Sequence, residues 1–184
     1  MTRSSRLSWL LAVIGALLLT KGSFAVYPFL FPNNRVAEVS IVTPGNYTDA
    51  RFKPGSELFR LSLPRHDSTF TVVEGTTEAA LRKGPGHLEG SPLPGVPGNS
   101  VIAGHRDTHF RVLKDVLVGD EVRVDLADQS YVYRIVDIRV VSPKDTYVLR
   151  SESGQVLTLI TCYPFRYFGP APERYIVQAR LFEP

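Results

Sequence analysis

Short runs in which apolar and polar residues alternate occupy much of the chain. The clearest are Tyr131–Val141, Gln155–Tyr163 and Arg174–Phe182. A period of two is typical of β-strands, because successive side chains point to opposite faces of a sheet. Further strands are predicted at Val36–Val42, Leu58–Leu63, Thr69–Glu74, Ser100–Gly104 and Glu121–Leu126. Many short strands with little helix favour an all-β fold, a closed or nearly closed antiparallel barrel.

Helical segments are predicted to be few and short. Thr77–Lys83 is the clearest, because threonine can cap a helix, Glu78 supports its first turn, and Gly84-Pro85-Gly86 ends it. Residues 84–99 follow as a loop rich in glycine and proline, and a long loop inside a compact domain is usually functional. Asp107–Val118 is predicted as a loop with one helical turn.

The N-terminus begins with a basic segment and continues with two apolar patches. The apolar run Leu7–Leu19 and the patch Phe24–Phe31 are separated by Lys21. A cleaved signal peptide and an uncleaved membrane anchor both fit this pattern. We favour the anchor, a single crossing by Leu7–Phe31 in which Lys21 reaches the membrane surface. Both interpretations place the rest of the chain outside the cytoplasm.

Three segments are therefore expected. Residues 1–31 are predicted to be the anchor, residues 32–56 a linker, and residues 57–184 the β domain. At 184 residues the chain has room for one domain of ordinary size besides the anchor.

The positive charge of the protein comes from its N-terminus. The formal net charge is +3, but residues 1–35 hold four basic residues and no acidic one, which leaves 17 basic and 18 acidic residues in 36–184. No run of lysine and arginine with interleaved aromatic residues follows. Because nucleic-acid binding needs a concentrated positive surface, we expect no nucleic-acid partner.

The single cysteine lies where a strand stops. Cys162 ends the apolar run from Gln155, and Pro164 cannot donate a hydrogen bond to a neighbouring strand. On that strand Leu157, Leu159 and Thr161 face one side, and Cys162 faces the other. One cysteine excludes an intrachain disulfide and a zinc site built from several cysteines. A lone cysteine is commonly a small buried apolar residue, so its role depends on which reactive side chains lie near it.

Four histidines are possible partners for the thiol. His66 and His87 lie among turn residues and are expected to be solvated, and His109 is expected to be structural or peripheral. His105 differs, because it follows the apolar strand that ends at Gly104. A nearby imidazole can take the proton of a cysteine or stabilise its thiolate, and can then protonate a leaving amine.

Arg174 begins the last predicted strand. Its guanidinium is permanently charged and carries several donors in a rigid fork, so it could stabilise negative charge on a carbonyl oxygen. The simpler alternative is a surface arginine paired with Glu173 or another acid.

Three blocks of sequence together resemble the sortase family, in particular its class D branch. They are Gly104-His105-Arg106-Asp107, Thr158-Leu159-Ile160-Thr161-Cys162 and Arg174 twelve positions later. The flanks Gly98–Ala103 and Gly169–Tyr175 are similar too, and the resemblance covers about residues 57–182.

The resemblance implies an all-β, eight-stranded closed barrel with short helices, preceded by an N-terminal anchor helix and held outside a bacterial membrane. It implies Cys162 as nucleophile, His105 as acid and base, and Arg174 as oxyanion or substrate clamp. Members of the family cleave a C-terminal sorting signal of Leu-Pro-x-Thr type on surface proteins and pass the acyl group to an amine of a cell-wall precursor or a pilin lysine. No organic cofactor is expected, and no acidic cluster is found for the calcium that some members use.

Two alternatives stay open. A cysteine peptidase would use the same residues and give its thioester to water, although a papain-like fold is disfavoured because its cysteine precedes its histidine. A membrane-tethered binding module with a structural cysteine would need no chemistry at all.

Overall fold

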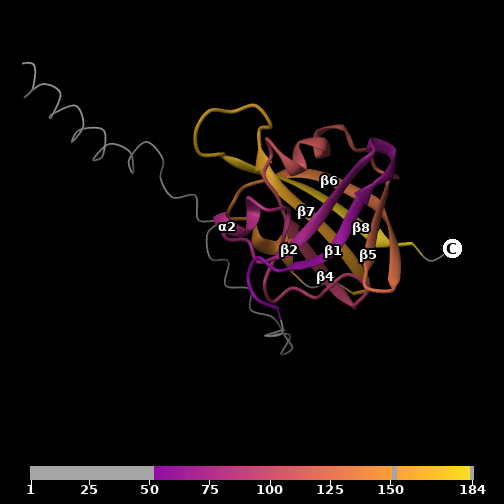
Figure 1. The fold of residues 1–184 in the computed structure, drawn as a ribbon. Coiled ribbons are helices and arrows are strands. Elements are labelled where there is room, and N and C mark those ends of the chain that lie inside the picture. Colours follow the sequence, from indigo (N-terminus) through magenta and orange to yellow (C-terminus); the bar gives the residue numbers. More distant parts are fainter. Residues whose placement is uncertain (1–51, 151–152, 183–184) are drawn as a thin grey trace, which may run out of the picture. The chain divides into compact units, whose positions relative to one another are not determined.

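The computed structural model describes residues 52–150 and 153–182, and strands are its main secondary structure. Figure 1 shows the strands arranged side by side around a barrel, with the short helix α2 beside them. The strands are β1 (Glu57–Leu63), β2 (Ser68–Glu74), β3 (Gly86–His87), β4 (Gly98–Ala103), β5 (Glu121–Leu126), β6 (Gln129–Val141), β7 (Gln155–Tyr163) and β8 (Glu173–Leu181). The helices are α2 (Glu78–Leu81) and the 3₁₀ segments η1 (Pro64–His66), η2 (His109–Asp115) and η3 (Thr146–Leu149).

The eight strands close into a barrel in the order β1-β2-β3-β4-β7-β8-β6-β5, and β5 pairs with β1. The predicted all-β closed barrel is thus confirmed. The prediction of purely antiparallel pairing is wrong, because β2–β3 and β4–β7 are parallel. Parallel pairing needs a long crossover, and the hairpin of β5 and β6 with its loops lies between β4 and β7 in the chain.

Strand β7 pairs with β4 on one side and with β8 on the other. Its side chains alternate as predicted: Leu157 and Leu159 are fully buried in the main core. Ile160 faces the other side and packs against a second cluster built by Val141, Val148 and Ile176. The strand ends at Tyr163, directly before Pro164. Burial on both faces makes β7 a rigid support for its last residues.

Most predicted elements agree with the structure to within a few residues. The Thr77 hydroxyl caps α2 by accepting a hydrogen bond from the Ala80 amide at 3.3 Å. The loop predicted over 84–99 is interrupted by β3, which bridges β2 and β4. A two-residue strand is too short to show alternation in a sequence, which is why the prediction missed it.

The expectation that His66 and His87 are solvated is wrong. The ring of His87 is 4 % exposed, because β3 places it inside the sheet. His66 Nε2 lies 3.3 Å from Asp120 Oδ2. Desolvation opposes ionisation of Asp120, but hydrogen bonds from Arg65, the Leu117 amide and His66 outweigh it and lower the pKa of that carboxyl.

None of the helices in residues 52–150 and 153–182 is both long and apolar enough to cross a membrane. The predicted anchor over 1–31 and the predicted strand at Val36–Val42 lie outside the described residues. Residues just before β1 take part in the barrel, since the Gly55 amide donates to the Glu74 carbonyl at 2.7 Å.

Candidate active site

Cys162 and Arg174 lie opposite each other on neighbouring strands. β7 and β8 are antiparallel, and their register pairs the two residues directly. Residues paired in this way have Cβ atoms about 5 Å apart. The thiol is free and partly exposed, so a substrate can reach it.

His105 lies on the other side of Cys162. β4 and β7 are parallel, with Ala103 beside Ile160 as the last pair. The contacts continue past that pair: the Gly104 amide donates to the Ile160 carbonyl at 3.0 Å, and the Thr161 hydroxyl donates to the Gly104 carbonyl at 2.6 Å. His105 and Cys162 are the next residues of the two chains at this end of the sheet. The three predicted site residues therefore gather at one end of β4, β7 and β8.

Gly104 fixes the path of the chain into His105. A Cβ atom at this position would lie 2.6 Å from Cδ2 of the buried Phe110 ring, too close for any side chain. The Phe110 amide in turn donates to the His105 carbonyl at 3.0 Å. Glycine here lets η2 pack tightly against the end of β4.

The His105 ring makes only a loose contact with the rest of the protein. Its side chain is 33 % exposed, and its Nε2 atom lies 3.8 Å from Glu78 Oε2, a carboxylate that is itself largely exposed. Such a pair contributes little to stability. Burial lowers the pKa of nearby His109, and the positive charge of His105 lowers it further. The ring of His105 is thus accessible to a bound group.

Arg174 is held by the backbone rather than by an acid. Its Nη1 donates to the carbonyls of Glu173 at 2.9 Å and Ala171 at 3.2 Å. Within the described part of the chain no carboxylate forms an ion pair with it. The alternative of a surface arginine paired with Glu173 is wrong, because only the carbonyl of that residue is engaged. The other donors of the fork are left for a ligand.

The loop between β7 and β8 is tied to the histidine side of the site by Arg106. The Arg106 guanidinium donates to the carbonyls of Pro164 at 3.2 Å and Tyr167 at 3.0 Å, and stacks on the Tyr167 ring. No role for Arg106 is predicted from the sequence. The arginine could have been suspected from its place directly after His105, but its partners lie about sixty residues away in the chain.

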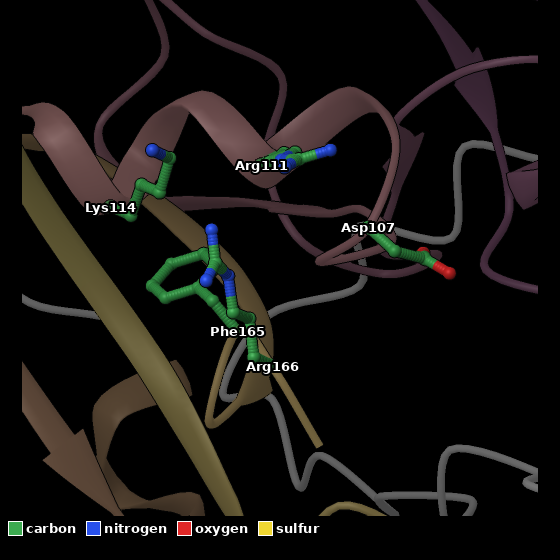
Figure 2. Close-up of a pocket in the computed structure, with 5 residues that line it drawn as sticks. All are labelled: Asp107, Arg111, Lys114, Phe165 and Arg166. Carbon is green, nitrogen blue, oxygen red and sulfur yellow. The ribbon is translucent and has the colours of Figure 1, made fainter. Parts of the chain in front are cut away.

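A small pocket lies beside these residues, between η2 and the start of the β7–β8 loop (Figure 2). It encloses about 210 Å³. Its lining residues are Asp107, Arg111, Lys114, Phe165 and Arg166. None of them was singled out from the sequence, because each looks like an ordinary solvated charge or a loop aromatic.

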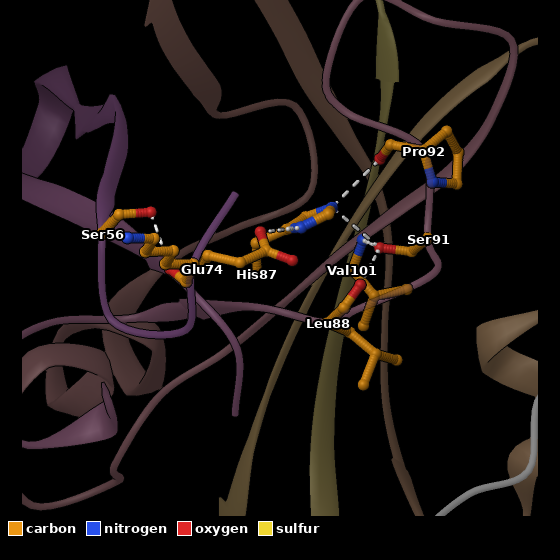
Figure 3. A network of polar contacts seen from close by, with 8 residues as sticks. Ser56, Glu74, His87, Leu88, Ser91, Pro92 and Val101 are labelled. Carbon is orange, nitrogen blue, oxygen red and sulfur yellow. Dashed lines mark hydrogen bonds and ion pairs between the residues drawn. The ribbon is translucent and has the colours of Figure 1, made fainter. Parts of the chain in front are cut away.

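A second polar group has the geometry of a catalytic triad but is buried. Glu74 Oε2 lies 2.9 Å from His87 Nδ1, and His87 Nε2 lies 3.0 Å from Ser91 Oγ (Figure 3). However, the Ser91 hydroxyl donates to the Leu88 carbonyl at 2.8 Å. His87 Nε2 also faces the Pro92 carbonyl at 3.3 Å, which can only accept. His87 therefore donates through Nε2 and cannot take a proton from Ser91, so this group is structural.

No group of three His, Cys, Asp or Glu side chains in residues 52–150 and 153–182 is arranged to hold a metal ion.

Known proteins share both the sequence and the fold. The family model for the sortase domain matches residues 61–182. Sortase D of Bacillus subtilis (strain 168) is 38 % identical over 134 residues, which cover 71 % of this chain and 68 % of the relative. The structure of a Clostridium perfringens sortase D5 transpeptidase matches with a TM-score of 0.66 and 31 % identity, over 72 % of this chain and 82 % of the other.

Sortase A from Corynebacterium diphtheriae is similar in structure as well. It matches with a TM-score of 0.65 and 31 % identity, over 71 % of this chain and 62 % of the other. These matches agree with the closed barrel and with the order of the sequence blocks that contain His105, Cys162 and Arg174. The chain belongs to the sortase family of transpeptidases.

Proposed function

We propose that this sortase cleaves a C-terminal sorting signal of Leu-Pro-x-Thr type and transfers the acyl group to an amine through a thioester on Cys162. The observation that carries the proposal is the register of β7 and β8, which sets Cys162 opposite Arg174. The backbone link from Gly104 to Ile160 and Thr161 adds His105 on the other side.

In the first half of the reaction, the Cys162 thiolate attacks the threonine carbonyl carbon of the signal. The carbonyl oxygen becomes negative, and the Arg174 guanidinium donates to it. The carbon–nitrogen bond then breaks, and the protonated imidazole of His105 gives its proton to the departing amine. The products are an acyl thioester on Cys162 and a free amine.

In the second half, the acceptor amine attacks the thioester carbonyl carbon. Neutral His105 takes the proton that the nitrogen loses, and the carbon–sulfur bond breaks to return the thiolate. A new amide bond joins the surface protein to the acceptor. The anchoring of Arg174 to the Glu173 and Ala171 carbonyls supports this role, because a fixed donor need not reorganise as charge develops.

The place of this reaction is also part of the proposal. Residues 1–31 would anchor the enzyme in the bacterial membrane by a single crossing, and residues 32–56 would link the anchor to the catalytic domain at 57–184. The excess of positive charge before the apolar run supports a domain on the extracytoplasmic side. The amine would then be that of a cell-wall precursor or a pilin lysine, and the substrates would be surface proteins.

Mass spectrometry of the purified full-length chain tests the chemistry. The chain is incubated with peptides that carry Leu-Pro-x-Thr followed by varied residues, with and without an added amine. We expect an adduct on Cys162 that ends at threonine and is released onto the amine. Hydrolysis despite a wide panel of amines would instead make the protein a peptidase. An unmodified and unreactive Cys162 would leave only a binding module.

A further inference from the structure

The pocket beside the active site is lined mainly by positive groups. Arg111 and Lys114 come from η2, and Arg166 comes from the β7–β8 loop. Figure 2 shows the Arg166 side chain extending toward η2, whereas the Asp107 carboxylate points away from it. We call this group of Arg111, Lys114 and Arg166 the cationic pocket. Phe165 supplies its apolar wall.

Within the described part of the chain, no acidic side chain forms an ion pair with Arg111 or Arg166. Lys114 is paired only with the adjacent Asp115, Nζ to Oδ2 at 3.2 Å. An exposed cation alone is well solvated and indicates nothing about binding. Two arginines and a lysine from two segments around one hollow are different, because an anion placed there would meet all three.

The position of the cationic pocket relates it to one half of the reaction. Asp107 follows His105 by two residues and Phe165 follows Cys162 by three, so their Cα atoms are within about 8 Å and about 11 Å of those residues. Arg174 lies across β7, on β8. The pocket thus lies near both the imidazole and the thiol, and an acceptor amine that attacks the thioester must come close to both.

We propose that the cationic pocket binds a carboxylate carried by the acceptor amine, so that this enzyme prefers acceptors with an amine and a carboxylate in one molecule. The inference rests on the proposed transfer function and adds a specificity to it. Arginine suits this task, since its planar fork matches a carboxylate with two parallel hydrogen bonds. A volume of about 210 Å³ holds a carboxylate with several carbon atoms and some water.

A series of ω-amino acids, H₂N–(CH₂)ₙ–COO⁻, tests the proposal and measures the distance it requires. Each is compared with its own carboxamide, which has the same amine and length but no charge. The full-length chain is first loaded by a Leu-Pro-x-Thr peptide, and the yield of thioester on Cys162 is recorded. The rate of transfer to each acceptor is then measured against acceptor concentration.

At the chain length that spans the site, we expect kcat/KM for the amino acid to exceed that for its carboxamide about tenfold, equivalent to about 1.4 kcal/mol. The double variant Arg111→Gln/Arg166→Gln should bring this ratio close to one. A matched control is Arg123→Gln, an exposed arginine on β5 that pairs with Glu121 and lies on a strand that contacts neither β4 nor β7. The control should keep the ratio.

The outcomes separate this inference from the proposed function. A ratio near one at every length, or a ratio that survives in the double variant, would overturn the carboxylate site while leaving the transfer function intact. Absence of the thioester would overturn both. A preference seen only when the carboxylate is on the leaving segment of the signal peptide, measured in the rate of thioester formation, would assign the pocket to that segment and overturn the acceptor site.

Discussion

His87 and His105 lie on neighbouring segments of the same barrel and have opposite surroundings. His87 is 4 % exposed, and both of its ring nitrogens face fixed partners within 3.3 Å. The side chain of His105 is 33 % exposed and has one loose contact at 3.8 Å. The more complete hydrogen-bond network belongs to the structural residue. A catalytic histidine must be held by its backbone, as Gly104 and Phe110 hold His105, while its ring stays free to exchange protons.

The side chains next to these two histidines, Ser91 and Cys162, differ in the same way. The Ser91 hydroxyl has its proton engaged by the Leu88 carbonyl and also accepts from the Val101 amide at 3.2 Å. Cys162 is partly exposed and lies opposite a guanidinium. A triad-like arrangement of side chains therefore does not by itself identify an active site. An active site is distinguished by substrate access to the nucleophile and by a nucleophile whose proton is not already held in a hydrogen bond.

The largest effect is expected from Cys162→Ala. Removing the nucleophile should lower transfer by about 10⁴-fold or more, because no thioester can form. The fold should persist, since a strand-end thiol contributes little packing. Adduct formation by mass spectrometry and far-UV circular dichroism check these two points. Ser91→Ala is the matched variant: it should keep full activity per folded molecule, and a Ser91→Ala enzyme that is folded yet inactive would reverse our assignment of the two groups.

His105→Gln should lower kcat/KM by about 10² to 10⁴-fold, the usual contribution of a general acid and base. Its thermal midpoint should stay near that of the wild type, because the ring has a single weak contact. Kinetics with a saturating amine and thermal unfolding give the two values. If the variant unfolds early and is fully active, His105 is structural and the comparison with His87 fails.

Arg174→Lys should cost about 10²-fold in kcat, since an ammonium cannot reproduce the forked donor that stabilises the oxyanion. The loss should appear in the rate of thioester formation measured in a single turnover. Arg123→Lys, on the surface of β5, serves as the control for the same chemical change. Equal rates for wild type and Arg174→Lys would remove Arg174 from the site.

Glu74→Gln should act on stability instead of on catalysis. Glu74 and His87 form a buried hydrogen-bonded pair with side chains 8 % and 4 % exposed, and a glutamine amide is a weaker partner for His87 Nδ1 than a carboxylate. We expect the free energy of unfolding to fall by about 1 to 3 kcal/mol. The only tryptophan is Trp9, which precedes the described residues, so urea unfolding is followed by circular dichroism. Glu57→Gln, at the exposed start of β1, should change little.

The sequence predicts the barrel well because alternation is strong where one face is buried. In β7, Leu157 and Leu159 are buried in the core while Cys162 faces outward, as the period of two requires. The same alternation brought out the strand ends at which Cys162, His105 and Arg174 lie. Cys162 and His105 stand out because each ends a predicted strand, whereas the role of Arg174 rests on the resemblance to sortases.

What the sequence could not predict depends on contacts between distant segments. The burial of His87 is set by Glu74 and Ser91, which reach it from β2 and from the loop after β3. The β3 strand itself has too few residues for a pattern. The cationic pocket combines Arg111 with Arg166, and neither stands out from its neighbours in the chain. Parallel pairing, too, leaves no local signal, so the antiparallel barrel expected from the sequence does not contain the parallel pairs β2–β3 and β4–β7.

The smallest expected effect is on His109, and it tests the placement of His105 without any substrate. Burial lowers the pKa of His109, and repulsion from positively charged His105 lowers it further. In His105→Gln that repulsion is gone, so the pKa of His109 should rise part of the way to its ordinary value, while the effect of burial remains. Proton NMR of the imidazole signals across pH measures this shift, and added salt should shrink the difference between wild type and variant.

His66→Gln is the control for the His109 titration, since His66 is engaged with Asp120 at the start of β2. That variant should leave the pKa of His109 where it is. An unchanged His109 titration in His105→Gln would mean that the two rings do not approach each other in solution. His105 would then not be held at the end of β4, and the contrast between a backbone-held, accessible His105 and an enclosed His87 would lose its physical basis.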